Sequence, residues 1–146
     1  MFCRIALIAL MAAGISCAAQ PPAVIPQEPF PIHAWIGPPS EETTVERYRE
    51  LRDAGFTYSF SGYPDNDANE KALDVAGECG IKLFIATRAL HDDTEGTVRR
   101  FMNHPALAGY HLVDEPHAKD FPGLGEWTQR IRAIDDDHFC YINLFP

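Results

Sequence analysis

Residues 81–86 read Ile-Lys-Leu-Phe-Ile-Ala and follow directly on Gly80. An almost uninterrupted apolar run of this length is typical of a strand that is buried on both faces, as strands of parallel sheets are. Segments with apolar residues at helical spacing lie on both sides of it, over 67–79 and 95–103. We therefore predict a parallel-sheet strand over 81–86.

The same alternation of strand-like and helix-like segments continues from Ile32 to the end of the sequence, which favours parallel βα units. Strands are predicted over 32–36, 56–60, 81–86, 107–113 and 139–144, and helices over 40–54, 67–79, 95–103 and 120–134. The first helix has Ser40 as its cap candidate, the second begins with a capping-box pattern of Asp67 and Glu70, and Gly55 and Gly80 end these two helices.

Strands that recur every 25 to 30 residues or so match the repeat of a (β/α)8 barrel, for which about 250 residues is typical. The expected fold class is therefore α/β, a partial (β/α)8 TIM barrel of about five strands and four helices that is truncated at its C-terminus. A complete five-stranded doubly wound sheet is the alternative. It is less favoured, because that fold normally covers its last strand with a helix.

Composition limits the partners that this protein can have. The 146 residues contain 12 Lys and Arg against 21 Asp and Glu, a net charge of -9. This charge repels phosphate backbones and anionic headgroups, so nucleic acid is not an expected partner. The aromatic fraction of 11% is compatible with a site that stacks sugar rings.

The first residues have the pattern of an export signal. Arg4 precedes an apolar run over 5–15, which small residues follow, so 1–19 is predicted to be a signal peptide. Cys17 lies where a bacterial lipoprotein is cleaved and lipidated, which would attach the protein to a membrane. Residues 20–31 form a Pro-rich linker, and 32–146 form the barrel portion. We expect an exported protein that is periplasmic, extracellular or anchored to the outer membrane.

Cys79 and Cys140 lie beyond the predicted signal. In an oxidising compartment they could form one disulfide, but two small buried thiols are the favoured interpretation.

The strand over 107–113 delivers two adjacent carboxylates, Asp114 and Glu115, and Pro116 then ends it because proline cannot donate to a sheet ladder. A pair of acids at the end of a strand is a catalytic arrangement, since glycosidic bonds are cleaved by two carboxyl groups.

The run 103–110, Asn-His-Pro-Ala-Leu-Ala-Gly-Tyr, together with 112–116, Leu-Val-Asp-Glu-Pro, resembles retaining glycoside hydrolases of clan A, which are (β/α)8 barrels. In those enzymes the fourth strand ends in Asn-Glu-Pro, and the glutamate is the general acid/base. The resemblance implies that role for Glu115 and a carbohydrate substrate. Asp114 replaces the family asparagine, so the sugar cannot be transferred. The family nucleophile lies at the end of the seventh strand, which is expected to be missing from this chain.

Other strand ends carry candidates for substrate binding. His33 and Trp35 share one side of the first strand, Arg88 follows the third, His117 follows the acid pair, and Asn143 ends the fifth. Ser61, Tyr63 and Asp65 after the second strand are interpreted as a capped turn.

Two further functions stay open. One is a metal-dependent hydrolase with Asp114, Glu115 and His117 as ligands, joined by His91 or His33, although no paired metal-ligand motif is present. The other is a non-catalytic glycan-binding surface lipoprotein. No cofactor is expected.

Overall fold

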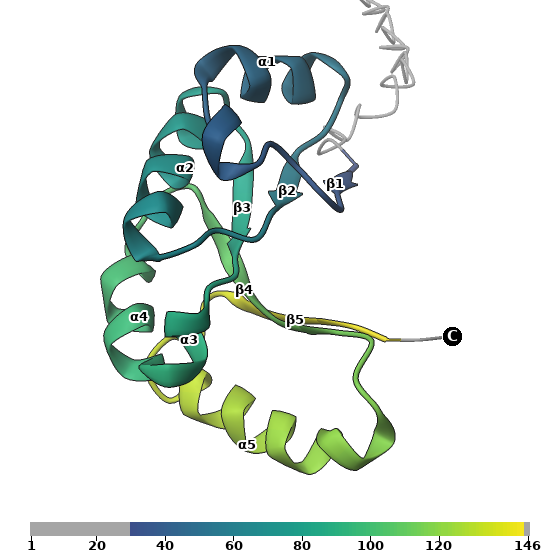
Figure 1. Ribbon diagram of the computed structural model, residues 1–146, viewed down its shortest axis with the longest axis vertical. Coiled ribbons are helices and arrows are strands. Elements are labelled where there is room, and N and C mark those ends of the chain that lie inside the picture. Colours follow the sequence, from purple (N-terminus) through teal and green to yellow (C-terminus); the bar gives the residue numbers. More distant parts are fainter. Residues whose placement is uncertain (1–29, 145–146) are drawn as a thin grey trace, which may run out of the picture.

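The computed structural model describes residues 30–144 as one curled sheet with helices on its outer side (Figure 1). All five strands are parallel and lie in the order β1-β2-β3-β4-β5. The strands are β1 His33–Ala34, β2 Tyr58–Phe60, β3 Lys82–Ile85, β4 Leu107–Asp114 and β5 Phe139–Asn143. The helices are α1 Val45–Asp53, α2 Asn66–Glu78, α3 Arg88–Asp92, α4 Thr94–Phe101 and α5 Phe121–Arg132, with short 3-10 turns η1 Ser40–Glu42 and η2 Ala118–Asp120.

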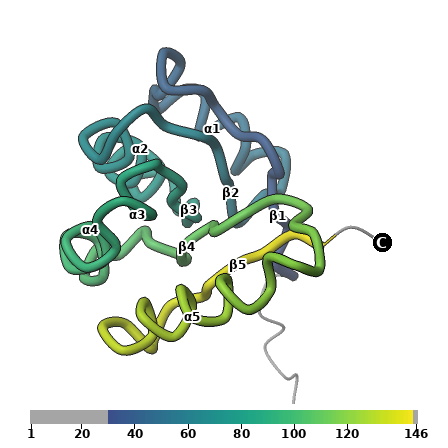
Figure 2. Tube along the Cα trace, turned by 60° about the horizontal axis from the view of Figure 1, so that its bottom comes forward, coloured from purple at the N-terminus to yellow at the C-terminus, as the bar shows by residue number. Residues whose placement is uncertain are grey.

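The strands curve through half a barrel, and the helices follow their convex side (Figure 2). The predicted α/β class and the five parallel strands are confirmed. The prediction of four helices was wrong, because α3 forms a separate helix after β3. The predicted signal peptide, Cys17 and residues 20–29 of the linker lie outside the described residues. Within 30–144 no helix is long and apolar enough to cross a membrane.

Short polar side chains set where the helices begin, and two of these positions differ from the prediction. The helix predicted from Ser40 is interrupted after η1. α1 begins at Val45 and is capped by Thr44, whose hydroxyl accepts from the Arg47 N–H at 3.4 Å. Asp65, and not Asp67, caps α2 by accepting from the Ala68 N–H at 2.8 Å. Asp65 therefore belongs to a capped turn, as predicted.

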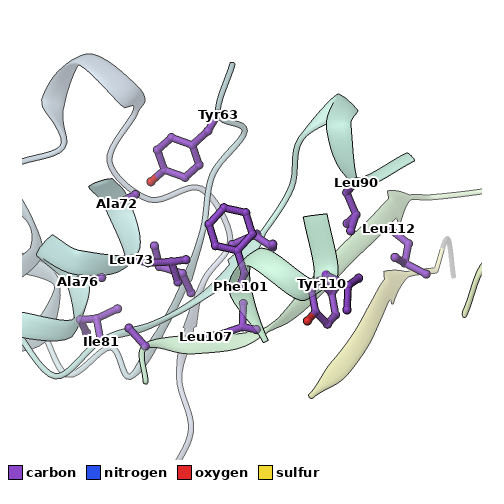
Figure 3. Close-up of a cluster of buried hydrophobic side chains, with 14 of the residues drawn as sticks. Tyr63, Ala72, Leu73, Ala76, Ile81, Leu90, Phe101, Leu107, Tyr110 and Leu112 are labelled. Atoms are coloured by element: carbon purple, nitrogen blue, oxygen red, sulfur yellow. The ribbon is translucent and has the colours of Figure 1, made fainter. Parts of the chain in front are cut away.

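The main core lies between the sheet and the helices (Figure 3). Alternate residues of β3 and β4 point outward into it, and the apolar sides of α2 and α4 cover them. Tyr63 is also buried here, where its hydroxyl lies 2.7 Å from that of Tyr48. The fully buried members include Leu73, Ile81, Leu83, Ile85, Leu90, Phe101, Leu107 and Tyr110. Cys79 is a buried free thiol and Cys140 is a half-buried one. This confirms the favoured interpretation that both cysteines are thiols.

The concave side of the sheet carries a second set of side chains, which is aromatic. His33 of β1, Phe84 of β3 and Tyr141 of β5 meet one another, with ring centroids 5.3 to 5.7 Å apart. Phe60 of β2 and His111 of β4 form a separate contact at 4.1 Å. Odd-numbered strands therefore supply one layer and even-numbered strands the next, and Trp35 packs against Phe60 and His111.

β4 and β5 approach one another closely at Gly109. A Cβ atom on this residue would lie 2.1 Å from the Phe139 carbonyl oxygen. Further along, the register between the two strands shifts between His111 and Val113. The extra residue changes which later side chains of β4 face the concave side.

Candidate functional site

The candidate site lies at the carboxyl end of β4, where the acid pair leaves the sheet. Glu115 has a φ of 47°, and it is the only residue other than glycine with positive φ in the described part of the chain. Its N–H donates to the Asn143 carbonyl oxygen at 2.8 Å, which ties the turn to β5. A left-handed conformation costs a non-glycine residue about 1–2 kcal/mol. The fold therefore holds an exposed carboxylate residue in a strained backbone conformation.

Asp114 and Asn143 occupy one register position across β4 and β5. The Asn143 amide donates to the Asp114 carboxylate, with Nδ2 and Oδ1 2.7 Å apart. Asn143 lies two residues beyond Tyr141, so this pair shares the concave side with the aromatic layers. The bulge in β4 thus brings Asp114, and not Val113, into line with Asn143.

His111 lies beneath this pair on the same strand. Its side chain is 8% exposed, and its Nε2 atom has no hydrogen-bond partner among the described residues. The Nε2 atom of His33 is likewise buried and unpartnered. Burial lowers the pKa of both imidazoles; for His111 the Asp114 carboxylate opposes this effect and His33 adds to it. The concave side therefore holds two neutral histidines, one in each of its aromatic layers.

These histidines predict how stability depends on pH. A lowered pKa means that the unfolded chain takes up the proton first, so the stability that neutral His111 contributes is complete above about pH 6.5 and is lost as the pH falls through its folded pKa. We expect the free energy of unfolding to decrease from pH 7.5 to 5.5, with up to about 1.4 kcal/mol per pH unit from this residue. Urea denaturation at several pH values measures the slope.

The matched variants are His111→Phe and His117→Phe. The first replaces an imidazole that stacks on Phe60 with a ring of similar size, and it should flatten the pH dependence. The second changes an exposed histidine and should leave the slope as it is. Equal slopes in wild type and His111→Phe would show that His111 does not cause the pH dependence of stability.

The strained turn at Glu115 gives a second prediction. Glu115→Gly is expected to have a free energy of unfolding about 1 kcal/mol above that of Glu115→Ala, because only glycine adopts this φ without strain. In α5 the exposed Glu126 offers the control, where the alanine variant should exceed the glycine variant by about 1 kcal/mol. The same ranking at both positions would show that Glu115 is not strained.

The remaining candidates are not all brought together. Trp35 lies at the end of β1 on the concave side with His33, whereas Arg88 begins α3 and pairs with Asp92 at 3.0 Å. His117 precedes η2, and its N–H donates to the Asp120 carboxylate at 3.1 Å. Trp35, Asn143 and Asp114 therefore share one region of the concave side, while Arg88 and His117 belong to local structures of neighbouring loops.

No metal site is formed by the candidate residues. Between residues 30 and 144 no three side chains of His, Cys, Asp or Glu are grouped closely enough to hold a metal ion. His91 lies beside Asp92 and against Trp127, away from the acid pair.

Sequence reasoning missed His111, Phe60 and Tyr141 as neighbours of the site. The alternation of side chains within each strand could have indicated them, because it shows which residues of a strand face the concave side. To know which of these residues contact one another, the register between the strands is also needed, and local sequence does not give that register.

Comparisons of the chain with family models, with curated proteins and with solved structures give no match in any of the three. Function is therefore inferred from the site itself.

Proposed function

We propose that this chain is part of a retaining glycoside hydrolase with a (β/α)8 barrel, in which Glu115 is the general acid/base. The observation that carries the proposal is the position of Glu115: an exposed carboxylate in a left-handed conformation at the carboxyl end of a strand in a curled parallel sheet. Active sites of barrel enzymes lie at this end of the strands, and strained residues cluster at such sites.

The concave layers support the barrel. A closed (β/α)8 barrel is filled by side chains from alternate strands, four to a layer. His33, Phe84 and Tyr141 come from three odd-numbered strands and lie within 6 Å of one another as ring centroids, as three members of such a layer would. Further strands would complete the layer and close the sheet.

The chemistry assigned to Glu115 is proton transfer to the leaving oxygen of the sugar, followed by removal of a proton from water. The Asp114 carboxylate accepts a hydrogen bond from the Asn143 amide, and this bond fixes the position of the Asn143 side chain.

The nucleophile is proposed to come from outside the described residues. Retaining enzymes place their second carboxylate about 5 Å from the acid. In neighbouring strand-end loops, Glu42 pairs with Arg47 at 3.0 Å and Asp65 caps α2, so both of these acids are already engaged. The five strands alone are therefore expected to bind sugar without hydrolysing it.

The substrate is proposed to be a carbohydrate that contacts Trp35 and the aromatic end of the concave side. Trp35 is half-buried, which leaves part of its ring available for stacking. Export, with or without lipidation at Cys17, belongs to the same proposal and depends on sequence alone. Polysaccharides outside the cell would then be the accessible substrates.

The test compares a neutral oligosaccharide with a cationic iminosugar. The transition state of glycoside cleavage is oxocarbenium-like, and a cationic iminosugar resembles it. An iminosugar should therefore bind more tightly when a carboxylate occupies the acid/base position. We expect Glu115→Gln to weaken iminosugar binding about ten-fold or more while oligosaccharide binding changes little. Titration followed by tryptophan fluorescence measures both, with Trp35→Phe as the signal control.

Each alternative gives a different result. Equal iminosugar binding in wild type and Glu115→Gln would favour a non-catalytic glycan-binding protein. Hydrolysis of aryl glycosides by this chain alone would overturn the proposal that the nucleophile lies outside the described residues. A folded wild-type chain that binds neither ligand class would contradict the glycoside hydrolase proposal.

A further inference from the structure

A single residue of β5, Asn143, contacts both acids of the turn that follows β4. The two strands run side by side, and the turn leaves β4 next to the end of β5 (Figure 1). The Asn143 carbonyl oxygen accepts from the Glu115 N–H at 2.8 Å, and its side-chain amide donates to the Asp114 carboxylate at 2.7 Å. Among the described residues, Asn143 is the only hydrogen-bond partner of the Asp114 side chain.

The local chain does not favour the backbone conformation of Glu115. Its φ of 47° lies in the left-handed region, which residues other than glycine adopt only at a cost. Pro116 follows directly, and the residue before a proline prefers an extended backbone with negative φ. Such a conformation persists only where the surrounding structure holds it. At this turn the hydrogen bonds that do so come from Asn143, one to Glu115 itself and one to the residue before it.

The turn also decides how the two acids are placed relative to one another. In an extended strand, neighbouring side chains point to opposite faces of the sheet. Asp114 shares the concave side with Asn143, so a Glu115 that continued the strand would point to the convex side. The left-handed turn breaks this alternation at the end of the strand. Without the contacts to Asn143, Glu115 could return to an extended backbone, and its carboxylate would move.

We propose that Asn143 is the positioning residue of the acid/base. Its amide fixes Asp114, its carbonyl oxygen fixes the Glu115 N–H, and together these contacts keep the Glu115 carboxylate in place. Asparagine suits this task because its side chain supplies a donor to a carboxylate, whereas an ionised aspartate could only accept. The role in proton transfer rests on the proposed function, but the contacts that hold the turn do not.

Amide hydrogen exchange measures the hold on the turn without any ligand. Asn143→Asp removes the donor and sets two carboxylates against one another, so the Glu115 N–H is expected to exchange about ten-fold faster or more than in wild type. The double variant Asp114→Asn/Asn143→Asp restores one donor and one acceptor in the reverse direction, at the wild-type net charge. Its Glu115 N–H should exchange close to the wild-type rate. The Ala68 N–H, which donates to Asp65 at the start of α2, is the control and should exchange alike in all three proteins.

Iminosugar binding then shows whether this hold serves the acid/base. The measured quantity is the loss of affinity that Glu115→Gln causes, taken within each background so that the charge added by Asn143→Asp cancels. The loss is expected to be about ten-fold in the wild-type background and about two-fold or less in Asn143→Asp. It should return to about ten-fold in the double variant, because the hydrogen bond between the two strands is restored.

Equal losses in the three backgrounds, or unchanged exchange at Glu115 in Asn143→Asp, would overturn the inference. Faster exchange at Glu115 and Ala68 alike, without recovery in the double variant, would show a general loss of stability and would overturn it as well. Failure of the proposed function gives another result: Glu115→Gln would leave iminosugar binding unchanged in the wild-type background. In that case exchange at Glu115 still decides whether Asn143 holds the turn.

Discussion

Gly109→Ala is expected to lower the free energy of unfolding by about 3 kcal/mol or more. The added Cβ would lie 2.1 Å from the Phe139 carbonyl oxygen and 2.9 Å from the carbonyl carbon and the nitrogen of the same residue. All three are backbone atoms, so no side-chain rotation relieves the clash. β4 and β5 would have to separate.

This separation would extend to the candidate site, because the same two strands carry the Asp114–Asn143 hydrogen bond and the link from the Glu115 N–H. The control is Gly125→Ala, within α5, where nothing lies within 4 Å of the added Cβ. It should raise the free energy of unfolding by about 0.5–1 kcal/mol. Urea denaturation of both variants gives the comparison, and a loss below 1 kcal/mol for Gly109→Ala would mean that the strands can adjust.

Asp135→Ala is expected to cost about 3 kcal/mol of unfolding free energy. Asp135 is 4% exposed and accepts from the Tyr110 hydroxyl at 2.5 Å and from the Asp137 N–H at 3.2 Å, and its carboxylate lies 2.8 Å from His138 Nδ1. Burial alone would raise the pKa of Asp135, but these hydrogen bonds lower it overall. Burial and this carboxylate raise the pKa of Tyr110, so the phenol keeps its proton and donates it.

A double-mutant cycle with Tyr110→Phe apportions the effect. Tyr110 is fully buried on the outer side of β4, so either single substitution leaves a partner without its hydrogen bond. We expect a coupling free energy of about 1.5–3 kcal/mol. The Asp135 contribution should also disappear as the pH falls through the acidic range, since its pKa is lowered in the fold. Additive losses in the cycle would assign the cost of Asp135→Ala to its other contacts.

Most of the strands could be predicted from sequence because their signals are local. The run over 81–86 is almost entirely apolar, which indicates a strand buried on both faces, and β3 forms there over Lys82–Ile85. α3 was missed because five residues are too few to show helical periodicity. What establishes it is Thr87, whose hydroxyl accepts from the Leu90 N–H, a single hydrogen bond that follows a strand directly.

The candidate site was predictable in position and unpredictable in arrangement. That Asp114 and Glu115 end a strand follows from Pro116 alone. That Asp114 and not Val113 lines up with Asn143 depends on the register shift between His111 and Val113, and that shift exists only where β4 meets β5. The same holds for the contacts of His111, whose neighbours Phe60 and Tyr141 come from other strands.

The sequence by itself determined the alternation of strands and helices, the burial of the strands and the place where two acids leave the sheet. These properties come from the spacing of apolar residues and from a proline that cannot pair. Only the tertiary structure decided that Glu115 takes a left-handed backbone, that Asn143 holds Asp114, and that two neutral histidines lie in the aromatic layers. The physical reason is that backbone contacts between β4 and β5, brought close at Gly109, set the register, and register joins residues that lie far apart in the chain.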